Sequence, residues 1–240
     1  MLSSNKDQQV APGVFVSPEH PSMFLGRRLF LRYAGFTVAA SGLLMACSST
    51  ETVQVTPSVV DLGSGDTGIL NYAYALEQLE AAFYTQVIAT PYANMSADEK
   101  TILTEIRDHE IIHREFFKAA LGSSAIIGLT PNFTAVNFSD RASVLGAAKT
   151  FEDLGVGAYN GAGRLIKSAD YLTLAGKIVS VEARHAAIIR DLLSARTANF
   201  AGDDVVNPTS GLDNAYTPSQ VLPLAQPYVN NKISGANLPQ

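Results

Sequence analysis

The stretch VEARHAAIIRDLL, residues 181–193, places Glu182 and His185 three positions apart in a run that is otherwise largely apolar. Residues three apart on an α-helix lie on the same face, so this carboxylate and imidazole project side by side. The same spacing recurs at Glu110 and His113 within DHEIIHREFF. Carboxylate and imidazole together are a ligand set suited to iron, manganese or zinc. Two helices of one chain are therefore predicted to carry matching halves of a metal site.

Two other stretches, LEQLEAAFY and FEDLGVGAY, are predicted to supply the remaining carboxylates. Each places a glutamate seven residues before a tyrosine, Glu77 before Tyr84 and Glu152 before Tyr159. Seven residues are close to two helical turns, so each glutamate and its tyrosine share a helix face. The two halves of the chain thus repeat one order, which is Glu, Tyr and then Glu-x-x-His. This order predicts a degenerate tandem of two helical hairpins.

Apolar residues recur with the helical period in four segments. Ser96 and Glu99 form a capping-box pattern, Gly122 is a typical helix stop, and Ser168 is a plausible N-cap. The predicted helices span about residues 67–89, 96–121, 139–167 and 169–198. A longer connection, GSSAIIGLTPNFTAVNF, separates the second helix from the third. Short connections within each half and one long crossover predict an all-α four-helix bundle.

The third helix contains the stretch GVGAYNGAG, whose four glycines each cost about 1 kcal/mol relative to alanine in a helix interior. Either this helix is locally weak or another segment packs unusually close to it. Beyond Ala201 the chain is rich in Asn, Pro, Gly and Asp. We expect a mostly irregular C-terminal segment, with one short helix near residues 218–224, that wraps over the bundle.

The N-terminal stretch GRRLFLRYAGFTVAASGLLMAC has the features of an export signal. Arg27 and Arg28 precede an uncharged run from Tyr33 to Ala46, which is too short to span a membrane. The paired arginines resemble a twin-arginine signal, and residues 44–47 resemble a bacterial lipobox that would be lipidated at Cys47. The predicted organisation is an export signal (1–46), a tether (47–66), the helical bundle (67–200) and the C-terminal segment (201–240).

Composition excludes several other classes of protein. The 240 residues are 47% hydrophobic, which is sufficient for one substantial core. A formal net charge of -5 argues against nucleic-acid binding, which requires a basic surface. The single cysteine excludes an intramolecular disulfide and a metal site built from several cysteines.

One glutamate from each of two helices and Glu-x-x-His from each of two others is the ligand pattern of ferritin-like dimetal-carboxylate bundles. FEDLGVGAY and VEARHAAIIRDLL further resemble the exported ferritin-like proteins grouped with desiccation-related proteins, and the likeness covers about residues 67–196. The resemblance implies two metal ions, iron in preference to manganese, with Glu110 and Glu182 bridging them. The implied ligands are Glu77, Glu110, His113, Glu152, Glu182 and His185.

Glu80 competes with Glu77 for the role of ligand, because it lies one turn away on the same helix face. Glu77 is preferred because its spacing to Tyr84 repeats that of Glu152 to Tyr159. Glu80 is then expected either beside the ligands or on the surface.

Three kinds of neighbouring residue have simpler roles. His109 is expected beside the ligands or on the surface rather than on the metal. Tyr84 and Tyr159 are expected to hydrogen-bond to ligand carboxylates or to pack in the core. Arg184 and Arg190 are expected to form salt bridges on the fourth helix.

Three functions fit these predictions. The first is a dimetal oxidoreductase acting on peroxide, dioxygen or ferrous iron in envelope stress protection. The second is a dimanganese, catalase-like enzyme, since the same donors suit manganese. The third is a non-enzymatic envelope protein with a structural metal. The expected location is the bacterial cell envelope outside the cytoplasm, with a lipid anchor in the membrane. Storage of iron in a closed protein shell is not expected, because an anchor, a tether and a long C-terminal segment would obstruct the assembly of such a shell.

Overall fold

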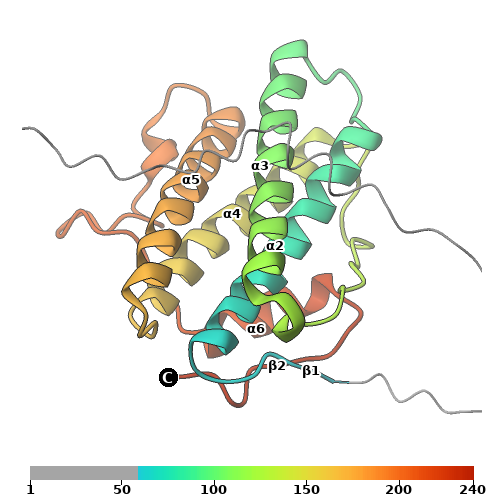
Figure 1. The fold of residues 1–240 in the computed structure, drawn as a ribbon. Helices are drawn as coiled ribbons and strands as arrows, with labels where there is room; N and C mark the ends of the chain where they lie inside the picture. The colour runs from blue at the N-terminus through green and yellow to red at the C-terminus, as the bar shows by residue number, and fades with distance from the viewer. Residues whose placement is uncertain (1–58) are drawn as a thin grey trace, which may run out of the picture. The chain divides into compact units, whose positions relative to one another are not determined.

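The computed structural model describes residues 59–240, so the predicted export signal and Cys47 lie outside the described residues. Four long helices form two hairpins, one of α2 with α3 and the other of α4 with α5 (Figure 1). Their bounds are α2 (Gly65–Ala89), α3 (Ala97–Leu121), α4 (Arg141–Gly163) and α5 (Ala169–Leu193). The predicted all-α bundle is thus confirmed. Within residues 59–240, no helix combines the length and apolar character needed to cross a membrane.

Local capping explains where these helices begin. The Ser96 side chain accepts a hydrogen bond from the Glu99 backbone N–H (3.1 Å), and the Glu99 carboxylate accepts one from the Ser96 N–H (3.2 Å). This is the predicted capping box. Ser168 caps α5 as predicted, and its hydroxyl accepts from the Tyr171 N–H. Asp140 caps α4 by accepting a hydrogen bond from the Ser143 N–H at 2.9 Å.

Two helices end earlier than the sequence predicts. Helix α4 stops at Gly163 rather than near residue 167, because the next N–H groups bond to carbonyls only three residues back. Helix α5 stops at Leu193 rather than near residue 198, and Arg196 beyond it has a φ of 59°, which a helix cannot accommodate. Helix α3 ends as predicted before Gly122, whose φ is 54°.

The glycine-rich part of α4 is a continuous helix against which another segment packs closely. The Tyr216 N–H donates to the Gly157 carbonyl at 2.8 Å. A Cβ added at Gly161 would lie only 1.8 Å from the Tyr216 carbonyl oxygen. The glycines therefore allow a close approach of the C-terminal segment, which decides between the two interpretations of GVGAYNGAG.

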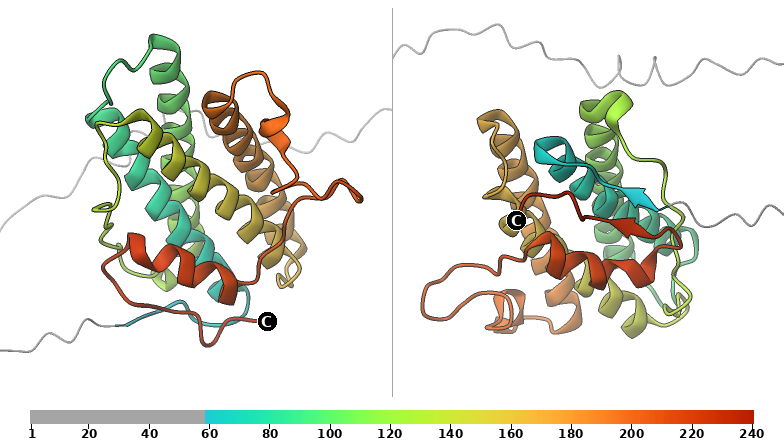
Figure 2. Two further views of the ribbon diagram at one scale, coloured as in Figure 1. Left: turned by 180° about the vertical axis from the view of Figure 1, so that it is seen from behind. Right: turned by 90° about the horizontal axis from the view of Figure 1, so that it is seen from below.

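The C-terminal segment runs along the bundle and ends beside the residues that precede α2 (Figure 2). Strand β2 (Ile233–Ser234) pairs in parallel with β1 (Val60–Asp61). The predicted short helix is α6 (Pro218–Ala225), which contacts α4. The remaining short elements are 3₁₀ turns, η1 (Gly122–Ser124), η2 (Ala198–Ala201) and η3 (Gln226–Tyr228).

The predicted tether ends too late in the sequence. Residue 66 was its expected limit, whereas Val60 is already paired in β1 and Leu62 is fully buried. Two apolar side chains so close to the bundle gain more from burial than from remaining solvated. The folded domain therefore includes residues from Val60 onward.

Arg190 connects α5 to both α4 and the C-terminal segment. Its guanidinium is 1% exposed and donates to both Asp153 oxygens (2.7 and 2.8 Å) and both Asp204 oxygens (3.0 and 2.8 Å). The predicted salt bridge of Arg190 is confirmed. The corresponding prediction for Arg184 is wrong, because its guanidinium donates to the Ser180 carbonyl and hydroxyl on its own helix.

Candidate metal centre

The structure brings all six predicted ligand residues together between the four long helices. Helices α2 and α4 each contribute one glutamate, and α3 and α5 each contribute a glutamate and a histidine. All six are buried, and their exposed fractions range from 0% for three of the glutamates to 9% for His113. The residues are Glu77, Glu110, His113, Glu152, Glu182 and His185.

These side chains form two overlapping groups. The first contains Glu77 and His113, the second contains Glu152 and His185, and Glu110 and Glu182 belong to both. Within each group the potential ligand atoms all lie within 4.8 Å of one another. Two four-residue groups that share two carboxylates have the arrangement of a dinuclear site with bridging glutamates.

Each histidine faces the glutamate of the other Glu-x-x-His helix. The His113 Nδ1 lies 2.8 Å from a Glu182 oxygen, and the His185 Nδ1 lies 2.8 Å from a Glu110 oxygen. Despite these short distances, neither Nδ1 has a partner with hydrogen-bond geometry, nor do the carboxylate oxygens of Glu110 and Glu182. Buried polar atoms without partners are costly. A cation coordinated by these converging atoms would satisfy them, so the residues present fit a metal.

The carboxyl groups have very different proton affinities in the metal-free protein. Burial, reinforced by the neighbouring Glu182, raises the pKa of Glu77 well above its usual range. Burial also raises the pKa of Glu152 to about 8, although His185 opposes the shift. Glu110 differs, because its two histidine neighbours outweigh burial and lower its pKa to about 2.

The two histidines hold protons tightly when no metal is bound. Burial by itself lowers their pKa, but the surrounding carboxylates outweigh it and raise the pKa of both His113 and His185 to about 12. Metal binding requires neutral imidazoles and ionised carboxylates. A cation entering the site therefore replaces protons.

The two tyrosines bond across the bundle rather than along their own helices. The Tyr84 hydroxyl on α2 donates to Glu152 on α4 at 2.5 Å, and the Tyr159 hydroxyl on α4 donates to Glu77 on α2. Burial raises the pKa of both phenols well above its usual range, which keeps them protonated as donors. The predicted hydrogen bonds to the carboxylates of the cluster are confirmed, and the structure adds that each tyrosine orients the glutamate of the other hairpin.

His109 supports His185 from α3. Its Nδ1 lies 2.9 Å from the His185 Nε2, and the two rings are nearly parallel. A partner on the second ring nitrogen fixes both the orientation and the tautomer of a ligating histidine. His109 is therefore placed beside the ligands, as one of its two predicted alternatives. The corresponding position in the other half is Val181, so this support exists on one side only.

Glu80 is buried, which rules out its predicted surface alternative. It is 3% exposed, and neither group of potential ligand atoms includes it. Its side chain lies over Gly155, where an added Cβ would be 3.0 Å from a Glu80 oxygen. Burial, followed by the nearby carboxylates, raises the pKa of Glu80 well above its usual range.

The comparisons agree with this geometry. Residues 65–195 match the family model of the ferritin-like domain, which is more than half of the 240-residue chain. No curated protein matches the chain significantly. The matched residues begin and end within two positions of α2 and α5, and so contain all six members of the buried cluster. The chain therefore belongs to the ferritin-like domain family.

Proposed function

We propose that the bundle binds two metal ions, iron in preference to manganese, through the six clustered residues. The observation that carries this proposal is the pair of overlapping groups whose buried nitrogen and oxygen atoms lack hydrogen-bond partners. Glu110 and Glu182 would be shared by the ions, while His113 and His185 would each bind one of them. Nitrogen and oxygen donors in this proportion suit iron and manganese.

We further propose that the centre is an oxidoreductase acting on a small oxidant. Two bound ferrous ions would supply two electrons, which with two protons reduce hydrogen peroxide to two waters or dioxygen to hydrogen peroxide, leaving two ferric ions. Each group contains four residues, so an octahedral ion bound through one atom of each would keep two positions open. Open positions favour a reactive centre over a purely structural one.

The chain's own residues would prepare this chemistry in two ways. Tyr84 and Tyr159 hold the carboxylates of Glu152 and Glu77 in fixed orientations by donating a hydrogen bond to each. The burial of the site excludes bulk water and strengthens the electrostatic interactions within it. The positions of the ligands are thus set before a metal enters.

Anaerobic titration with Fe²⁺ and, separately, with Mn²⁺ tests this function. We expect about two ions per chain, and a change in the optical spectrum when the iron-loaded protein meets dioxygen or peroxide. Peroxide breakdown by the manganese-loaded protein alone would favour the dimanganese, catalase-like alternative. Metal binding without reaction with either oxidant would favour the structural alternative, and binding of less than one ion per chain would overturn the proposal.

We also propose that the protein acts in stress protection at the bacterial cell envelope. The support is the sequence around Arg27, Arg28 and Cys47. Replacing Cys47 by Ser should abolish lipid labelling and release the protein from membranes. Replacing Arg27 and Arg28 by Lys should instead leave precursor in the cytoplasm. Unchanged membrane attachment of Cys47→Ser would contradict the lipid anchor.

A further inference from the structure

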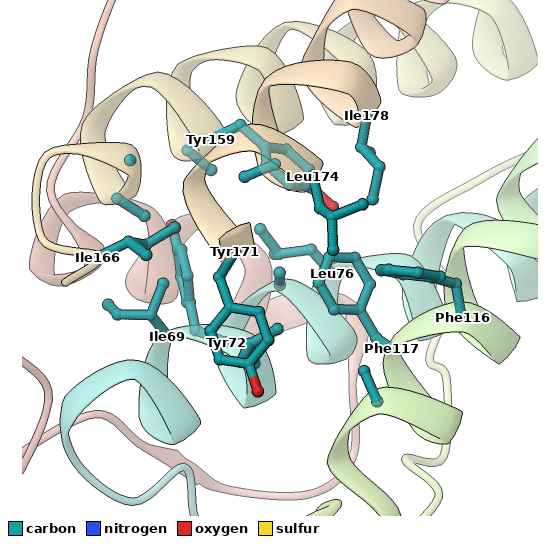
Figure 3. A pocket seen from close by; sticks show the side chains of 17 residues that line it. Ile69, Tyr72, Leu76, Phe116, Phe117, Tyr159, Ile166, Tyr171, Leu174 and Ile178 are labelled. Atoms are coloured by element: carbon teal, nitrogen blue, oxygen red, sulfur yellow. The ribbon is translucent and has the colours of Figure 1, made fainter. Parts of the chain in front are cut away.

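An apolar cavity of about 40 Å³ lies between all four long helices (Figure 3). Its lining side chains are aliphatic or aromatic, and their only polar atoms are the hydroxyls of three tyrosines. One edge is formed by Phe116, which is 36% exposed and marks a route to the surface. Among the labelled side chains that line the cavity are Tyr72, Leu76, Phe117, Tyr159 and Ile178.

The cavity adjoins the half of the metal centre that contains His113. Tyr159 lines it and donates its hydroxyl to Glu77. Two further lining residues lie one helical turn from site residues, Phe117 after His113 and Ile178 before Glu182. The Tyr159 ring therefore separates the cavity from the buried carboxylates.

The sequence repeat relates each residue that lines the cavity to a counterpart in the other half of the chain, and several of these counterparts are larger. Corresponding positions are offset by 75 residues between α2 and α4 (152 − 77) and by 72 between α3 and α5 (182 − 110). Phe83 and Phe151 pack edge to face, with their ring centroids 4.9 Å apart. Their counterparts in the repeat are Ala158 and Leu76, which both line the cavity.

Two further replacements have the same direction. Val87 and Leu103 are fully buried, whereas their counterparts, Ala162 and Ala175, line the cavity. Tyr72 and Phe117 are larger than their counterparts but form walls without filling the space. The cavity thus lies where four positions, on both hairpins, carry smaller side chains than their counterparts in the repeat; these are Leu76, Ala158, Ala162 and Ala175.

The cavity is suited to a small apolar molecule rather than to water or peroxide. A buried water needs two to four polar partners. The Tyr159 hydroxyl is already bonded to Glu77. The hydroxyls of Tyr72, which is buried without a protein partner, and Tyr171 are then the remaining polar atoms of the lining, which is at most the minimum that one water needs. The volume is about three times the 10–15 Å³ that one water requires, which suits a diatomic molecule better than an acyl chain.

We infer that this cavity binds dioxygen and delivers it to the His113 side of the centre. The inference rests on the proposed function and specifies the oxidant, because hydrogen peroxide carries two hydroxyl groups that an apolar lining cannot satisfy. Dioxygen would bind in the cavity and then diffuse past the Tyr159 ring to the metal ions.

Xenon binding tests the cavity independently of metal and of activity, because dry apolar cavities bind xenon. We expect the metal-free wild-type protein to bind one xenon atom here, measured by ¹²⁹Xe NMR and by crystals under xenon pressure. Ala162→Val with Ala175→Leu installs the side chains of the counterpart positions, Val87 and Leu103, and should abolish binding. Ala119→Leu, on the exposed surface of α3 and outside the lining, is the matched control and should retain it.

The iron-loaded protein gives the second measurement. In the filled variant we expect the rate of iron oxidation by dioxygen, relative to that by peroxide, to fall about tenfold, which corresponds to 1.36 kcal/mol in the barrier. Ala175→Leu alone serves if the double variant does not fold. Absence of xenon from the wild-type cavity, or equal slowing with both oxidants, would overturn the inference. A chain that binds xenon but no metal would refute the proposed function and leave the cavity established.

Discussion

The same glycine-to-alanine change should have opposite effects at two positions of helix α4. At Gly161 an added Cβ would lie 1.8 Å from the Tyr216 carbonyl oxygen and 2.4 Å from its carbonyl carbon. These are backbone atoms, so no side-chain rotation relieves the clash. At Gly146, on the same helix, an added Cβ meets nothing within 4 Å.

The magnitude follows from three contributions. In both variants, alanine in place of glycine favours the helix by about 0.5–1 kcal/mol. At Gly161 the clash costs about 1–3 kcal/mol. Displacing Tyr216 also removes its hydrogen bond to Gly157, which contributes about 0.5–1.5 kcal/mol. We expect Gly161→Ala to lower the free energy of unfolding by about 2 kcal/mol and Gly146→Ala to raise it by about 0.5–1 kcal/mol.

Chemical denaturation of the metal-free protein, followed by circular dichroism, measures both free energies. In thermal unfolding of a domain of this size, the midpoint temperature should fall by roughly 4–8 °C in Gly161→Ala and rise by roughly 1–4 °C in Gly146→Ala. A stability change of the same sign in both variants would refute the close-approach explanation of the glycine-rich helix.

Two further predictions concern charged groups. Because His113 and His185 have a pKa of about 12 and Glu152 one of about 8, metal must displace protons. The affinity for Mn²⁺ should therefore rise with pH, more steeply below about pH 8 than above it. Calorimetry in buffers of different ionisation enthalpy counts the protons that are released on binding. An affinity that does not depend on pH would contradict this prediction. Arg190→Met should lower the free energy of unfolding by about 2 kcal/mol, since the partly buried Asp153 loses two charge-assisted hydrogen bonds and keeps only Lys149 as an ion-pair partner. Asp204→Asn should lower the free energy of unfolding by less than about 1 kcal/mol, because Asp204 is 57% exposed. Denaturant titration measures both variants, and equal losses of stability would refute this account of the Arg190 ion pairs.

The sequence predicts the candidate site well because helical periodicity converts spacing into position. Glu182 and His185 share a face simply because they are three apart, and a repeated pattern on four helices requires the faces to converge. Capping residues such as Ser96 likewise act within one turn, so the helix starts are readable.

Features that depend on contacts between distant segments are not readable in this way. The hydrogen bonds that Tyr84 and Tyr159 each donate to the other hairpin depend on how the helices cross. The glycines of α4 indicate a close approach but do not identify Tyr216 as the partner, and the pairing of Val60 with β2 has no local signal. The apolar cavity arises from differences between hairpins that become meaningful only once the repeat is superimposed on the fold.

Metal content per chain in wild type, Glu182→Ala and Glu80→Ala tests the central claim most directly. Glu182 belongs to both groups of potential ligand atoms, whereas Glu80, equally buried, belongs to neither. We expect about two metal ions in wild type, almost none in Glu182→Ala and nearly two in Glu80→Ala, by elemental analysis of folded protein. Full metal occupancy in Glu182→Ala would contradict the account.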